Sequence, residues 1–243
     1  MSRAEDYLNT ALRRVGTKPD DSAEQPDKKR FSEQLSEAVA LAFAAELRDR
    51  GLKGTRPASP GELDQSGAER RMAGGISAKK VDVTYATEES GLILAISIKS
   101  INFVDGKSKN FQKNLTNRRG DMLFEAVTLH QRFPYAVLAG VFFFDEGAAT
   151  DGTKGRKATF LNAHQAFRLF TGRNDPAGRD EQYELFYIAL HGPGDGAPTA
   201  QFFAPGDPVN PVPIDRIFDQ LIELVGERNP DLYEVLDGRL KKT

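Results

Sequence analysis

The sequence predicts an α/β fold, a mixed central sheet flanked by helices. One reason is a pair of β-rich runs within residues 74–99, separated by a polar break that contains Gly91, as is typical of a hairpin. Another is the nearly continuous apolar run of residues 134–144, which is typical of a strand covered on both faces. Helical apolar spacing occurs before the hairpin and between it and this run. The order helix, hairpin, helix, strand therefore predicts an α/β core.

The remaining elements follow from apolar periodicity and from breaks rich in Gly and Pro. Residues 16–29 hold too few apolar side chains to pack, which predicts a linker. Helices are expected at 3–15, 31–50, 121–133, 158–170 and 214–225, the last continued by a short piece at 232–236, and further strands at 183–190 and 201–204.

This pattern divides the chain into an N-terminal appendage and one domain. Residues 1–30 are expected to form a helix and linker, and residues 31–243 a single domain. Within that domain, residues 31–145 would be the core and residues 146–243 a C-terminal extension.

Composition excludes several classes of protein. The 243 residues include no cysteine, which rules out disulfides, thiolate zinc sites and a cysteine nucleophile. His130, His164 and His191 lie far apart without metal-binding spacing, so any metal is expected to be oxygen-ligated. No leader or membrane span is evident, which predicts a soluble cytoplasmic protein without a membrane partner. The net charge of −2 means that a nucleic acid would have to meet a local basic surface.

The hairpin places an acid and an amine together. If its loop is centred between residues 89 and 90, Asp82 lies opposite Ser97 and diagonal to Lys99. Period-two alternation predicts one face shared by Val81, Val83 and Tyr85 and another by Ile93, Ala95, Ser97 and Lys99.

Two explanations of this pairing remain open. Asp82 can neutralise Lys99 as a half-buried ion pair. Alternatively, Asp82 and the carbonyl of Ile98 can hold a divalent cation while Lys99 orients a nucleophilic water.

Asp82 is followed, one hairpin later, by Ser97-Ile98-Lys99. This arrangement resembles the motif of the PD-(D/E)XK nuclease superfamily, which includes most restriction endonucleases. The resemblance covers roughly residues 31–144 and implies a restriction-endonuclease-like core. Ser97 departs from the usual acid of that motif, and Val81 stands where the motif has Pro. Some restriction enzymes of the superfamily have a Ser-x-Lys form whose missing carboxylate comes from the following helix.

Glu125, at the flank of the apolar stripe of the helix expected at 121–133, is the candidate for that displaced carboxylate. A boundary residue paired with Arg132 or a nearby lysine is the structural alternative. Glu37, Glu69 and Asp121 are possible substitutes. The resemblance then implies a Mg²⁺ site of Asp82, Glu125 and the Ile98 carbonyl, with Lys99 and Ser97 as further catalytic residues.

Basic residues around the hairpin are candidate DNA contacts. The segment 100–119 mixes cations with amides and aromatic rings, which suits phosphate positioning and base-edge contacts, although a solvated loop has the same composition. The candidates are Arg70, Arg71, Lys107, Lys109, Lys113, Arg118 and Arg119.

The expected function is a metal-dependent endodeoxyribonuclease of the type II restriction kind, acting on double-stranded DNA. Two alternatives stay open. One is a nuclease-like protein that binds nucleic acid or another protein without cleaving, which Ser97 favours; the other is a nuclease for branched DNA or RNA. The resemblance also allows a homodimer, which no residue establishes.

Overall fold

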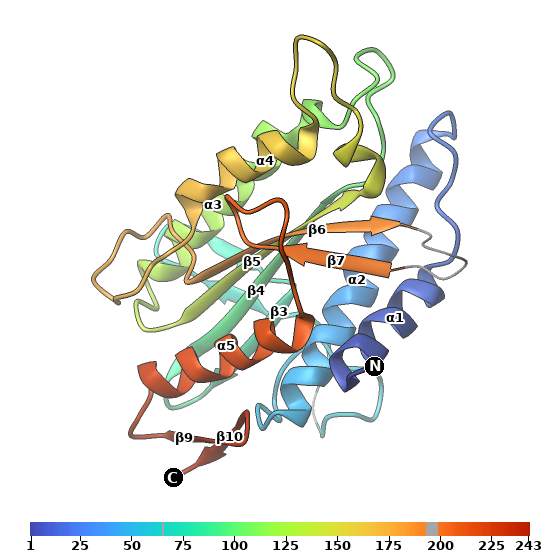
Figure 1. Ribbon diagram of the computed structural model, residues 1–243. Helices are drawn as coiled ribbons and strands as arrows, with labels where there is room; N and C mark the ends of the chain where they lie inside the picture. Colours follow the sequence, from blue (N-terminus) through green and yellow to red (C-terminus); the bar gives the residue numbers. More distant parts are fainter. Residues whose placement is uncertain (65, 193–198) are drawn as a thin grey trace.

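The computed structural model describes residues 1–64, 66–192 and 199–243. Figure 1 shows a central sheet with helices on both faces, which confirms the predicted α/β class. The sheet has six strands in the order β3-β4-β5-β6-β7-β8, and only the pairs β4 with β5 and β5 with β6 are parallel. The strands are β3 (Val83–Thr87), β4 (Gly91–Ile101), β5 (Val137–Asp145), β6 (Leu185–Gly192), β7 (Thr199–Phe203) and β8 (Pro211–Val212).

Three helices cover one face of this sheet: α1 (Arg3–Val15), α2 (Gln25–Asp49) and α5 (Ile214–Arg228). Their apolar side chains pack with those of β3, β4 and β5 in a single core cluster. The ring of Phe43 on α2 meets that of Phe218 on α5 at a centroid distance of 5.2 Å. Helices α2 and α5, which lie far apart in the sequence, therefore share one core.

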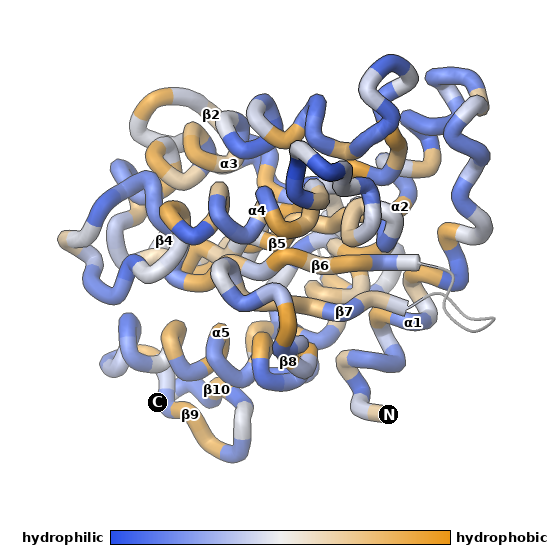
Figure 2. The backbone as a smooth tube through the Cα atoms, turned by 45° about the horizontal axis from the view of Figure 1, so that its top comes forward, coloured by the Kyte–Doolittle hydropathy of each residue, from blue (hydrophilic) through white to orange (hydrophobic). Residues whose placement is uncertain are grey.

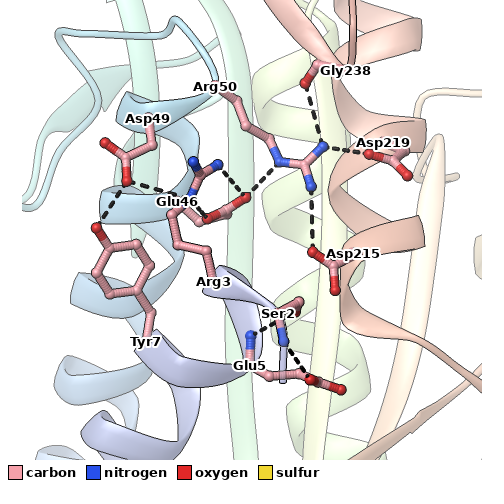
Figure 3. A network of polar contacts seen from close by, with 10 residues as sticks. All are labelled: Ser2, Arg3, Glu5, Tyr7, Glu46, Asp49, Arg50, Asp215, Asp219 and Gly238. Atoms are coloured by element: carbon pink, nitrogen blue, oxygen red, sulfur yellow. Dashed lines mark hydrogen bonds and ion pairs between the residues drawn. The ribbon is translucent and has the colours of Figure 1, made fainter.

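An ion-pair network joins the same three helices (Figure 3). The carboxylate of Glu46, 1% exposed, accepts hydrogen bonds from Arg3 Nε at 2.8 Å and from Arg50 Nε at 2.6 Å. Arg50 continues the network to Asp215 and Asp219 on α5. Buried charges are tolerated when they are paired and hydrogen-bonded in this way. The helix expected as an appendage is thus packed and bonded onto the core.

The other face carries α3 (Leu115–His130) and α4 (Thr159–Phe167), flanked by the short 3₁₀ helices η1 (Gln112–Asn114), η2 (Glu146–Ala149) and η3 (Arg168–Phe170). Phe142, Phe167 and Phe186 meet in the core beneath them. In Figure 2 the apolar residues concentrate along the strands, and the connecting loops are mostly hydrophilic.

Two small hairpins complete the fold. β1 (Arg71–Ala73) pairs with β2 (Ala78–Lys80), and β9 (Tyr233–Leu236) pairs with β10 (Arg239–Lys242). None of the helices within the described ranges is both long and apolar enough to cross a membrane.

Helix boundaries agree with the sequence in part. The helix expected at 3–15 is confirmed, with Ser2 and Glu5 forming a capping box. α2 begins at Gln25 instead of residue 31, because Pro26 starts the first turn, so the linker is shorter than expected. α3 likewise begins at Leu115, ahead of the expected residue 121.

The strand predictions need two corrections. Residues 74–85 do not form one strand: Ala78–Lys80 pairs with β1, and only Val83–Thr87 pairs with β4. The piece at 232–236 is a strand and not a continuation of α5, because α5 ends before Asn229 and the chain reverses at Asp237 and Gly238, both with positive φ.

The predicted faces of the hairpin are also partly wrong. An irregularity between Tyr85 and Ala86 shifts the pairing, so that Ile93 packs in the core with α2 while Ala95 packs in the core with α3. Val81 lies outside β3 and packs on the α3 side, away from Val83 and Tyr85. Beyond the irregularity the register is as expected from Tyr85 to Val83, since Val83 pairs with Ile96.

The packing around Gly140, the β5 residue that pairs with Ser97, predicts a stability defect. A Cβ there would lie 2.5 Å from the ring of Phe186, which is stacked against Phe167 and cannot move aside. We expect Gly140→Ala to lower the free energy of unfolding by about 1 to 3 kcal/mol, measured by urea denaturation.

Gly120→Ala on α3 is the matched control, because a Cβ there would meet no atom within 4 Å. Replacing a helical glycine should stabilise the protein by about 0.5 to 1 kcal/mol. Equal effects of the two substitutions would contradict the packing described at Gly140.

Candidate active site

Asp82 lies where the main-chain pairing of β3 with β4 stops. Its carboxylate Oδ2 accepts a hydrogen bond from the main-chain N–H of Ile98 at 2.6 Å and one from Lys99 Nζ at 3.3 Å. The side chain therefore continues the ladder in place of a main-chain carbonyl. Since the N–H and C=O of a strand residue point to the same side, the Ile98 carbonyl is directed toward this edge as well.

Lys99 lies between two carboxylates. Its Nζ is 3.3 Å from Asp82 Oδ2 and 3.9 Å from Glu125 Oε2, and the side chain is 20% exposed. Burial by itself lowers the pKa of Lys99, but the charges of Asp82 and Glu125 outweigh it and raise that pKa above its usual value. The ammonium is thus held in its charged form at neutral pH.

Glu125 reaches this group from α3, whose apolar stripe of Met122, Ala126 and Leu129 packs on the sheet. Its Oε1 accepts a hydrogen bond from Ser97 Oγ. Burial raises the pKa of Glu125 above its usual value, against the opposing effects of Lys99 and Ser97. No ion pair between Glu125 and Arg132 is present among the described residues. The cation beside Glu125 is Lys99, at 3.9 Å, so the structural alternative of a boundary acid paired with a nearby lysine fits the same contact.

The structure therefore brings together the side chains of Asp82, Ser97, Lys99 and Glu125, which come from a strand end, the neighbouring strand and the following helix. We call these four residues the acid–lysine cluster. The other candidate acids form no ion pair with Lys99 among the described residues: Asp121 is 3.9 Å from Arg118, Glu69 pairs with Lys80, and Glu37 is exposed on α2. Glu37 and Glu69 nevertheless line the same cleft as Asp82 and Lys99.

A cleft of about 1480 Å³ opens beside the cluster. Asp82, Ile98 and Lys99 line it directly, whereas Glu125 is 5% exposed and lies behind them. The opposite lining comes from the linker end of α1, the first half of α2 and the loop at residues 57–60. Its charged lining residues are Arg14, Lys28, Lys29, Glu33, Glu37, Glu69, Lys80, Asp82, Lys99, Asp105, Lys113 and Arg118.

Two of the predicted DNA-contacting residues line this cleft. Lys113 does so while paired with Asp105, and Arg118 does so near Asp121. The other five are outside its lining: Arg70 donates to the carbonyl of Ala86, Arg119 lies over the ring of Phe170, and Arg71, Lys107 and Lys109 are on exposed turns and strand ends.

Four cations of the cleft were missed in the sequence: Arg14, Lys28, Lys29 and Lys80. Basic residues are visible at positions 13–30, but their proximity to the hairpin follows only from the packing of α1 and α2 on the sheet.

Asn102, just past the end of β4, holds the lining of the cleft in place through side-chain and main-chain hydrogen bonds. Its Nδ2 donates to Ser32 Oγ on α2 and to Ser100 Oγ, each at 3.0 Å. Its Oδ1 accepts from His191 Nε2 at 2.8 Å, and its main-chain carbonyl accepts from Lys18 Nζ at 3.0 Å. These bonds tie α2 and the linker to the strand that carries Lys99.

The donor atoms beside the cleft suit a hard divalent cation, since they are the carboxylates of Asp82 and Glu125 and the carbonyl of Ile98. In the part of the chain that the structure describes, no group of three or more His, Cys, Asp or Glu side chains could hold a metal ion. In this structure the positive charge that lies between the carboxylates of Asp82 and Glu125 is the ammonium of Lys99.

Comparison with protein families, with curated proteins and with solved structures finds no match to this chain.

The buried imidazole that supports Asn102 predicts a pH dependence of stability. Burial lowers the pKa of His191 to about 4, with Asp145 opposing this effect and Lys18 adding to it. Between about pH 6.5 and 4 the unfolded chain binds a proton that the folded chain does not, so stability falls as the pH falls. Between pH 7 and pH 5 the wild-type protein should lose ~1 to 2 kcal/mol more of its free energy of unfolding than the His191→Gln variant.

Urea denaturation of both proteins at the two pH values measures this difference. The glutamine amide can still donate a hydrogen bond to Asn102, so the position of Asn102 in the lining of the cleft is retained. An equal loss of stability in both proteins would show that His191 is not the group responsible.

Proposed function

We propose that this protein is a metal-dependent endonuclease of the restriction-endonuclease type that hydrolyses phosphodiester bonds in double-stranded DNA. The observation that supports the proposal is the acid–lysine cluster at the edge of a large charged cleft. Two carboxylates around an ammonium, with a hydroxyl donor to one of them, supply the groups that such a hydrolysis requires.

Lys99 would act on the phosphate and the attacking water. A scissile phosphodiester is an anion and repels nucleophiles, so positive charge beside it lowers the barrier. The raised pKa of Lys99 keeps this charge in place at neutral pH. Its three N–H donors can bind a phosphate oxygen and orient a water at the same time.

Asp82, Glu125 and the Ile98 carbonyl would hold Mg²⁺. When bound, the metal ion would neutralise charge on the phosphate and favour deprotonation of water. Asp82 is prepared for this role because only Oδ2 accepts bonds from the described residues, while Oδ1 accepts none. Ser97 would orient the carboxylate of Glu125 through the hydrogen bond that it donates.

The size of the cleft favours a polymeric substrate. Pockets for small ligands usually measure about 300 to 1,000 Å³, and this cleft is larger at about 1480 Å³. Its cations come from several elements around the cluster, as expected for contacts to a chain of phosphates.

The test is cleavage of mixed-sequence duplex DNA with Mg²⁺, compared with the same reaction in excess chelator. We expect Asp82→Asn and Lys99→Ala each to lower the cleavage rate by at least about 100-fold, because each removes a charge from the reacting site. Lys242→Ala, which changes an exposed cation on β10, should cleave at the wild-type rate.

Thermal unfolding of each variant checks that the fold is retained. Wild-type rates in both Asp82→Asn and Lys99→Ala would refute the proposed site, and cleavage that persists in chelator would refute the metal requirement. Branched DNA and RNA in the same assay test the alternative that another nucleic acid is the substrate.

A second candidate function is binding of nucleic acid without cleavage. It is favoured by Ser97 in place of an acid and by the burial of Glu125 behind Lys99. Retention of duplex DNA with no cleavage in Mg²⁺ or Mn²⁺, and no effect of Asp82→Asn on metal affinity, would establish this function instead.

A further inference from the structure

We infer that the N-terminal segment, consisting of the end of α1, the linker at residues 16–24 and the first turn of α2, is a phosphate-binding wall for duplex DNA. The inference rests on the proposed function, because it names residues that would hold the DNA over the acid–lysine cluster. We call the segment the N-terminal wall; Arg14 and Lys28 are the two residues that would contact phosphates.

The two cations share the cleft with the acid–lysine cluster. Arg14 and Lys28 line the same cleft as Asp82 and Lys99, although they lie at least fifty residues away in the sequence. A strand of DNA whose scissile phosphate lies at Lys99 would therefore have neighbouring phosphates within the same cleft as these two cations.

The charges of the cleft lining are largely balanced by ion pairs. Most of the lining cations outside the acid–lysine cluster already have a carboxylate partner: Lys80 pairs with Glu69, Lys113 with Asp105 and Lys29 with Glu33. These pairs offer an incoming anion little net charge.

The N-terminal wall differs in this respect. Within residues 13–33 the ion pairs use Lys18, Lys29 and Arg30, so Arg14 and Lys28 have no carboxylate partner among the described residues. The bond that Lys28 Nζ donates goes to the main-chain carbonyl of Asp21, at 2.6 Å. These two side chains thus contribute positive charge to the cleft that no carboxylate of the described residues within 4 Å neutralises.

The N-terminal wall is fixed relative to the acid–lysine cluster. Lys18 Nζ bonds to Asp145 at 2.8 Å and to the carbonyl of Asn102 at 3.0 Å. The main-chain N–H of Val104 donates to Asp21, and the rings of Phe31 and Phe103 meet edge to face at 5.8 Å. A preorganised cation binds an anion with a smaller loss of conformational entropy than a mobile one.

The two cations are therefore expected to bind the DNA backbone and not its bases. Contacts to phosphate are insensitive to sequence and strongly dependent on salt, because each one releases condensed counterions. The N-terminal wall would strengthen binding of any duplex that the cleft accepts, without setting a recognition sequence.

The experiment compares two double variants that remove the same charge from the same two helices. Arg14→Gln/Lys28→Gln changes the cleft, and Arg13→Gln/Arg30→Gln changes exposed neighbours outside its lining. Binding of a fluorescent mixed-sequence duplex is measured by anisotropy in chelator, where no metal-dependent cleavage occurs, over a series of salt concentrations.

We expect the cleft variant to raise the dissociation constant about 10-fold or more and to reduce the slope of log K against log salt by roughly 2, one for each lost phosphate contact. The control should change the dissociation constant less than about 2-fold, as expected for cations outside the site. Thermal unfolding must show that both variants are folded.

Equal weakening in the two variants, or none in either, would overturn the inference, as would tighter binding of an RNA duplex of the same sequence. These outcomes are distinguishable from failure of the proposed function. Wild-type protein that binds duplex through Arg14 and Lys28 but does not cleave it would refute hydrolysis and support the N-terminal wall. Cleavage that is unaffected by the cleft variant, with unchanged binding, would refute the wall alone.

Discussion

The interaction on which the site depends is the ion pairing of Lys99 with Asp82 and Glu125. A lysine on a strand that is buried along most of its length is costly to desolvate, and two carboxylates offset that cost. Each carboxylate comes from a different element, so the charge balance also fixes how β3 and α3 sit against β4. The same arrangement that makes the lysine tolerable places its ammonium at the edge of the cleft.

The sheet topology explains why these groups meet at one point. Pairing of β3 with β4 stops at Val83, which leaves Asp82 to bond the next free N–H of β4 through its side chain. The parallel pairing of β4 with β5 requires a crossover, and α3 is that crossover. A helix that must return over the sheet in this way brings Glu125 back to Ser97.

Much of this was predictable from the sequence, because it depends on local periodicity. The α/β class, the register of Val83 against Ile96 and the approach of Glu125 to Ser97 agree with strand alternation and with the apolar stripe of one helix. The irregularity beside Tyr85 was not predictable, since no glycine or proline marks it, and it reversed the face of Ile93. The cations of α1 and α2 were missed because their place beside the hairpin depends on long-range packing.

The shared core of α1, α2 and α5 also bears on the order in which the chain folds. Leu8, Phe43 and Phe218 belong to one cluster although they lie far apart in the sequence. Contacts between such distant segments close long loops before they are rewarded, so they form slowly. Native burial of Glu46 and Arg50, whose partners lie on α1 and α5, is consequently a late step in folding.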